Sequence, residues 1–135
     1  MFNKFIISMK IFSWILRIVA AVIMLQTLYF KFTGQPESIA LFTLIRMEPW
    51  GRIGTGAMEL IASILILTPK TKVLGAGLGL GLMAGALFFH LTKVGIVDAT
   101  GSALLFTYAL VVFVSCAILL AMHFKDLKNF LPKKK

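Results

Sequence analysis

Long apolar blocks alternate with short polar segments along almost the whole chain. A helix that crosses the hydrocarbon core of a membrane needs about 20 predominantly apolar residues. Four blocks reach or approach that length, at about residues 11–30, 51–67, 73–92 and 102–123. None of them alternates between polar and apolar residues as a membrane β-strand does, and backbone groups in lipid must pair within their own segment. The pattern therefore predicts an all-α, polytopic membrane protein with a four-transmembrane-helix bundle.

The longest polar interruption, residues 32–50, has the signals of a short helix of its own. Pro36, Glu37 and Ser38 are suited to a helix start, Pro49 ends a helix, and apolar residues lie between them. We expect a short amphipathic helix between helices one and two, lying on the outer leaflet or folding over the mouth of the bundle. It is either a lid or binding element, or a simple tie between the two helices.

Composition places residues 1–135 in a single transmembrane domain. Of the 135 residues, 59% are hydrophobic and 14% are charged, whereas soluble domains carry about 25% charged residues. The chain therefore lacks the polar surface that a water-soluble protein of this length needs.

The net charge of +9 follows from the positions of lysine and arginine. Most of them lie on the side of the predicted helices that carries both chain ends, with a basic tail at residues 124–135; the opposite side has Lys31, Arg46, Arg52 and Lys93. Because positive residues are retained in the cytoplasm, both termini are expected to be cytoplasmic, in a membrane that we interpret as the bacterial cytoplasmic (inner) membrane. The lipid bilayer is the expected partner of this charge, and no nucleic-acid partner is expected.

The third predicted helix is rich in glycine. Gly77, Gly81 and Gly85 recur every four residues and so form one smooth stripe. Such a stripe is typical of close helix packing, either within one bundle or between subunits of a homo-oligomer.

Ionisable residues inside a span are costly and often mark a functional site. Glu59 lies near the middle of the second helix, on one face with Arg52, and His90 lies in the last outer turn of the third. A buried carboxyl must be neutral, paired or facing a polar cavity. Two alternatives stay open for Glu59: a structural carboxyl hydrogen-bonded to a neighbouring helix, or a ligand or proton site. Arg17 is expected to extend its long side chain to the cytoplasmic headgroups.

In the predicted topology several polar and aromatic residues share the outer half of the bundle. A pocket with a carboxylate, an imidazole and aromatic walls can bind a small polar ring, such as a quinone headgroup, or relay protons. Aromatic residues at this height are also ordinary interfacial anchors. The binding or proton-relay candidates are Glu59, His90, Lys31, Arg52, Tyr29, Trp50 and Tyr108.

Other chemistries have little support in the sequence. Cys116 is the one cysteine, so the chain cannot by itself run dithiol–disulfide exchange. His90 and His123 belong to different helices and opposite membrane faces, so no metal site is expected. No cofactor motif is evident, and we do not expect an autonomous enzyme, although an oxidoreductase subunit is compatible with the sequence.

Three segments together resemble the DoxX-like family. They are YFKFTG at residues 29–34, PWGRIGTGAMELIASILILTP at 49–69 and GALFFHLTKVG at 85–95. Within them, Lys31, Glu59 and His90 carry the likeness. The resemblance implies a compact four-helix membrane bundle associated with membrane redox systems, among them a small subunit of a thiosulfate–quinone oxidoreductase and a membrane partner of thiol-stress enzymes. Distantly similar eukaryotic proteins act as assembly or cargo factors.

The leading hypothesis is an integral membrane subunit or accessory factor of a redox system, with a quinone-binding or proton-relay pocket around Glu59 and His90. Its partners would be membrane or soluble redox proteins. The alternatives are a non-catalytic membrane chaperone or scaffold that binds another membrane protein, and a small-solute transporter.

Overall fold

The computed structural model of the chain describes residues 2–97 and 103–130, and these are almost entirely helical. The elements, in chain order, are α1 (Phe2–Thr33), α2 (Pro36–Leu44), α3 (Trp50–Leu67), η1 (Pro69–Thr71), α4 (Lys72–Phe89), η2 (His90–Val94), α5 (Leu104–Met122) and η3 (Phe124–Phe130). Four of these segments are long and apolar enough to cross a membrane. The prediction of an all-α four-helix membrane bundle is confirmed, and the chain is an integral membrane protein.

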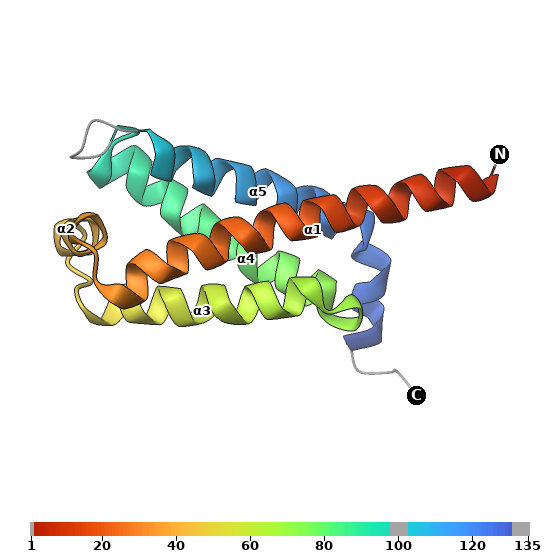
Figure 1. Cartoon of the computed structure of the whole chain (residues 1–135), viewed down its shortest axis with the longest axis horizontal. Helices are drawn as coiled ribbons and strands as arrows, with labels where there is room; N and C mark the ends of the chain where they lie inside the picture. Colours follow the sequence, from red (N-terminus) through yellow and green to blue (C-terminus); the bar gives the residue numbers. More distant parts are fainter. Residues whose placement is uncertain (1, 98–102, 131–135) are drawn as a thin grey trace.

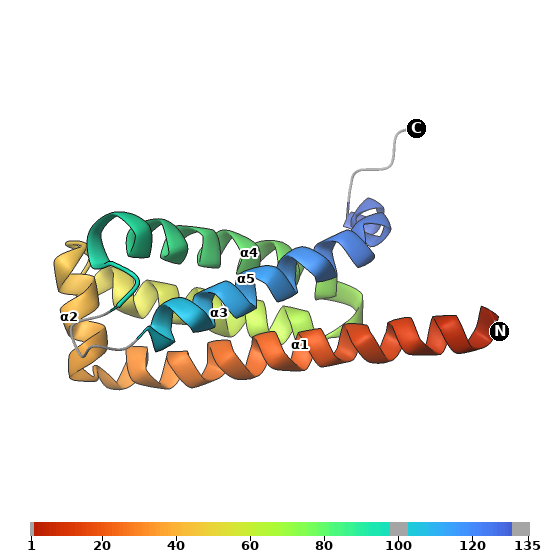
Figure 2. The ribbon, with the colours of Figure 1, turned by 90° about the horizontal axis from the view of Figure 1, so that it is seen from above.

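The four long helices form two pairs, α1 with α3 and α4 with α5. The pairs lie close together at the end that carries both termini, which we call the terminal end (Figures 1 and 2). They diverge towards the opposite end, where α2 lies crosswise between them; we call this the α2 end (Figure 1). The bundle is therefore a wedge whose wide end is filled by the short helix.

Two glycines let α4 approach its neighbours at the narrow end. A Cβ atom on Gly75 would overlap the backbone nitrogen of Ile66 in α3, and one on Gly79 would lie 2.8 Å from the Sγ of Cys116 in α5. Met24, Ile66 and Cys116 are at most 1% exposed there and belong to the packed core. Tight packing thus holds the terminal half of the bundle closed.

The predicted glycine stripe does not perform this packing within the chain. A Cβ atom on Gly77, Gly81 or Gly85 would have no neighbouring atom within 4 Å. The spacing of four places the three on one face of α4, but no other described helix packs against that face, and Gly75 and Gly79 make the close contacts instead. Packing of the stripe against a second subunit stays a prediction.

The helix predicted between the first two spans is present as α2, and it folds over the mouth of the bundle. Gly34, at φ +67°, ends α1 in the left-handed conformation that glycine adopts readily, and Gln35 N donates to Phe30 O over 3.2 Å. The chain therefore turns sharply and directs α2 across the wedge. The inward side chains of α2 are buried: Phe42 is 6% exposed, and Ile45, at the end of the helix, is 7% exposed.

Several helix boundaries differ from the predicted ones. α1 begins at Phe2, not near residue 11, because Lys4 and Lys10 interrupt the apolar pattern without interrupting the backbone hydrogen bonds; its first turns project beyond the bundle (Figure 2). The predicted tail at residues 124–135 begins as the short helix η3. Residues 131–135 lie outside the described part of the chain.

Arg17 does not extend to the headgroups as expected. Its side chain is 3% exposed, stacks over the ring of Trp14 at 3.6 Å and donates from Nε to Ile66 O over 2.6 Å. Ile66 O is one of the last carbonyls of α3, so the guanidinium stabilises the negative end of that helix. The residue has a structural role, by burial and not by reaching water.

Candidate functional site

A cavity of about 560 Å³ lies in the wide half of the wedge. Ligand pockets in proteins have volumes of roughly 300–1,000 Å³. Its floor includes Met24, Met83 and Val112, and its roof includes Leu41 and Phe42 of α2. Most of the lining is apolar, so the few polar groups in it are the ones that can orient a ligand.

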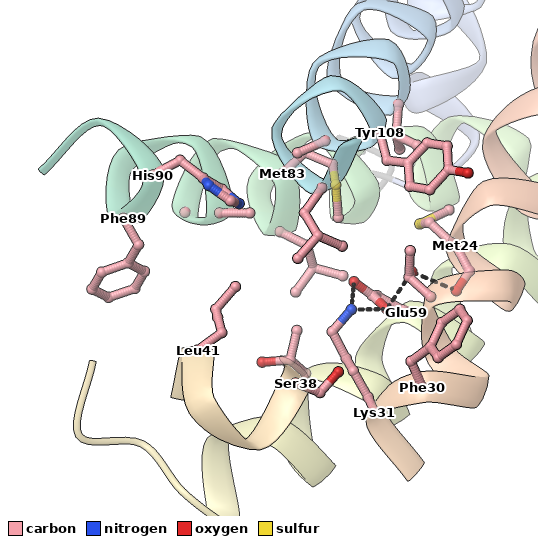
Figure 3. A pocket seen from close by; sticks show the side chains of 18 of the residues that line it. Met24, Phe30, Lys31, Ser38, Leu41, Glu59, Met83, Phe89, His90 and Tyr108 are labelled. Carbon is pink, nitrogen blue, oxygen red and sulfur yellow. Dashed lines mark hydrogen bonds and ion pairs between the residues drawn. The ribbon is translucent and has the colours of Figure 1, made fainter. Parts of the chain in front are cut away.

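One wall carries an ion pair between α1 and α3. Lys31 Nζ lies 3.1 Å from Oε1 and 3.0 Å from Oε2 of Glu59. The Thr27 hydroxyl lies 3.4 Å from Glu59 Oε2 and 3.0 Å from the carbonyl oxygen of Met24. Glu59 is 2% exposed, whereas the Lys31 side chain retains 15%. The carboxylate is thus held by a bidentate cation that remains accessible from the cavity (Figure 3).

The glycine-rich start of α3 explains why these two side chains meet. A Cβ atom on Gly56 would lie 2.8 Å from Phe32 and 3.1 Å from Leu28 on α1. The absence of a side chain at this position lets the two helices approach closely, less than one turn before Glu59. Lys31, next to Phe32 in the sequence, is thereby brought within reach of the carboxylate.

His90 lies on the opposite wall and is held by an irregular turn. α4 passes into the π-helical turn η2, which ends at Gly95 with φ +88°, a conformation suited to glycine. The Gly95 carbonyl oxygen lies 3.1 Å from His90 Nδ1. Because a carbonyl oxygen only accepts, Nδ1 carries a proton and donates it in this bond, and Nε2 takes no part in it. π-Helical turns often occur at functional sites.

Tyr108 of α5 also lines the cavity. Figure 3 shows His90 across from Lys31 and Glu59, and Tyr108 nearer to Met24, with its hydroxyl directed away from His90. The ring of Phe106 packs edge-on against His90 at a centroid distance of 5.8 Å. Among the described residues, neither His90 Nε2 nor the Tyr108 hydroxyl has a hydrogen-bond partner, so both are available to a ligand.

The other three sequence candidates lie outside the cavity lining. Arg52 bonds Glu48 through Nε at 2.9 Å and donates from its guanidinium to Lys31 O, so it ties α3 to α1 and does not pair with Glu59. Tyr29 and Trp50 are 61% and 65% exposed. Their helical positions turn them outward, as suits interfacial anchors.

Four polar lining residues were not among the predicted site residues: Gln26, Thr27, Ser38 and Thr55. Thr27 stands four residues before Lys31, on the same helical face, and this spacing was a usable signal. Gln26 and Ser38 carried none, because their contribution depends on how far the helix pairs diverge and where α2 comes to lie.

The arrangement provides a fixed ammonium donor and a buried carboxylate on one wall, an imidazole on the opposite wall, and a phenol on α5. Such a set can orient a flat ring that has polar atoms at opposite edges, and it can exchange protons with it. Comparisons with protein-family models, curated proteins and solved structures gave no match to this chain. The cavity itself is therefore the basis for inferring function.

Proposed function

We propose that this chain is a membrane-embedded subunit or accessory factor of a redox system, and that its cavity binds the ring of a quinone-class amphiphile. The observation that carries the proposal is the Lys31–Glu59 ion pair facing His90 and Tyr108 across a largely apolar cavity. The resemblance to the DoxX-like family supports the redox association. We place the α2 end at the outer face of a bacterial cytoplasmic membrane, following the distribution of lysine and arginine.

A quinone fits this chemistry because it is a flat, mostly apolar ring with two carbonyl acceptors at opposite edges. Lys31 Nζ is a donor for one carbonyl, and the Tyr108 hydroxyl is a donor for the other. Reduction of a quinone takes up two protons with two electrons. Glu59 and His90 are the titratable groups suited to relay these protons from water, each taking up a proton before passing it to the ring. The electrons would come from a partner protein, since Cys116 is a buried, single thiol.

Ligand binding can be tested with a matched pair of tyrosines. The purified chain in lipid nanodiscs is titrated with a decyl-substituted benzoquinone, and the dissociation constant is compared with those of Tyr108→Phe and Tyr29→Phe. Loss of one hydrogen bond is worth about 0.5–1.5 kcal/mol, so Tyr108→Phe should weaken binding roughly two- to tenfold. Tyr29→Phe, outside the cavity, should bind as the wild type does. Absence of saturable binding to the wild type would reject the proposal.

A second candidate function, a scaffold for another membrane protein, is favoured by the exposed glycine face of α4. Gly77, Gly81 and Gly85 leave the backbone open to a close-packed helix from a partner. In that case Gly77→Leu should abolish co-purification of the partner, whereas Glu59→Gln should leave it intact.

The structure gives less support to a solute transporter. The packed core of Met24, Ile66 and Cys116 lies between the cavity and the terminal end, so a path across the membrane would require the two helix pairs to separate there. Solute flux in vesicles that contain this chain alone would nevertheless establish that function.

A further inference from the structure

The cavity is closed towards the α2 end of the bundle. Phe42 of α2 and Ile45, which follows the helix, are buried, and the segment after α2 is fixed by a 2.8 Å hydrogen bond from Met47 N to Phe42 O. Arg52 then ties the start of α3 to the end of α1. A ligand that arrived from water along the bundle axis would have to displace this cover.

The side of the cavity formed by α4 has no such cover. Gly81 and Gly85 both line the cavity and are both exposed on the surface of the bundle. A side chain at either position would meet no atom within 4 Å of its Cβ. The divergence of α3 and α4 towards the α2 end places this bare stretch of backbone in the wide half of the wedge (Figure 1).

On the other side of the cavity, between α1 and α5, side chains cover the backbone. Gln26, Phe30 and Tyr108 line the cavity there, and Phe30 is 41% exposed. A ligand entering on that side would have to move at least one large ring. The unobstructed route lies over the two glycines of α4.

We propose that Gly81 and Gly85 form a lateral entrance through which a lipid-dissolved amphiphile enters the cavity ring first, with its tail remaining in the bilayer. The inference rests on the proposed function and adds the route. His90 gives the incoming ring a polar partner, because it is 5% exposed and its Nε2 has no hydrogen bond among the described residues. This nitrogen can accept a hydrogen bond from a hydroxyl of the reduced ring. The apolar tail stays in lipid throughout, so no apolar surface is transferred to water.

The test compares leucine at two lining glycines with leucine at a third glycine on the same face. Gly81→Leu and Gly85→Leu would narrow the entrance, whereas Gly77→Leu lies one turn further towards the terminal end and outside the lining. All three positions have room for a side chain, and leucine is a better helix former than glycine. Each variant is reconstituted in lipid nanodiscs and mixed with an azido-benzoquinone that carries a decyl tail, or with the same ring without a tail.

Photolabelling of the chain at successive times after mixing, quantified by mass spectrometry, gives the rate and the final extent of binding. We expect Gly81→Leu and Gly85→Leu to slow labelling by the tailed probe about tenfold at unchanged final extent, with Gly77→Leu indistinguishable from the wild type. Wild-type rates in both lining variants would overturn the entrance while leaving the binding proposal standing. Equal slowing by Gly77→Leu would also overturn the entrance, because the slower labelling would then come from a general change of this face of α4 and not from the two lining glycines. If neither probe labels the wild type, the proposed function itself fails.

Discussion

At the residue scale, the ion pair between Lys31 and Glu59 is the feature on which the site depends. Glu59 is nearly fully buried, and its two carboxylate oxygens are both bonded to one ammonium group. Removing one member of a buried pair leaves the other charge uncompensated, whereas removing both leaves an apolar cavity wall. The pair therefore links the stability of the bundle to the polarity of its cavity.

A double-mutant cycle should reveal this coupling. Lys31→Met should destabilise the chain by about 3–5 kcal/mol, because a buried carboxylate loses its counter-ion. The double variant Lys31→Met/Glu59→Gln should recover most of that loss. Unfolding in mild detergent, followed by circular dichroism, measures both effects. A double variant as unstable as Lys31→Met alone would show that the pair does not compensate the charge of Glu59.

At the element scale, the two faces of α4 have opposite relations to the rest of the chain. Gly75 lies against the backbone of α3, and Gly77 faces open space, although the two are only two residues apart. The inner face sets the distance between helices, and the outer face is free for lipid or a partner.

Alanine substitutions should separate these faces. Gly75→Ala should destabilise the bundle by about 1–3 kcal/mol, because the new methyl group overlaps a backbone that cannot move easily. Gly77→Ala should be neutral or stabilising by up to about 1 kcal/mol through higher helix propensity. Thermal unfolding in detergent compares the two directly. Equal effects would mean that the helix spacing at the narrow end is not set by Gly75.

A second element-scale feature is the docking of η3 at the terminal end. Ser13 Oγ lies 2.7 Å from His123 Nε2, and Asp126 Oδ2 lies 3.2 Å from Lys72 Nζ and 3.9 Å from His123 Nδ1. Burial lowers the pKa of His123 below its ordinary value; Lys72 and Arg17 lower it further, and Asp126 opposes them.

Docking of this segment should weaken in acid. The pKa of His123 is lower in the folded state than in the unfolded state, so the unfolded state binds the proton more readily. The stabilisation is therefore complete above about pH 6.5, the pKa of an unfolded histidine, and is lost as the pH falls through the folded pKa. Hydrogen exchange of the η3 amides, corrected for intrinsic rates, should therefore be faster near pH 5 than near pH 7.5. His123→Gln should abolish the difference. An unchanged pH dependence in that variant would assign it to another group.

At the scale of the whole molecule, the sequence was sufficient for the membrane bundle and only partly sufficient for the site. Lipid excludes unpaired backbone groups, so long apolar blocks leave little choice of structure. Both faces of α4 are apolar, however, so glycine spacing could not reveal which one faces the core. His90 is oriented by a π-helical turn and by Gly95, and no sequence pattern predicted either of them. The Glu48–Arg52 pair follows from an i, i+4 spacing in the sequence, although it was not among the predictions.

Whether the cavity holds a quinone-class ring can be decided by measuring the quinone content of the purified chain. The wild type, Glu59→Gln and the control Glu48→Gln would be purified from native membranes in mild detergent, and bound quinone extracted and quantified per chain. Glu59 fixes Lys31 in the cavity wall, whereas Glu48 pairs with Arg52 outside it. We expect near-stoichiometric quinone in the wild type and in Glu48→Gln, and its loss in Glu59→Gln. No quinone in the wild type, or equal amounts in all three, would contradict it.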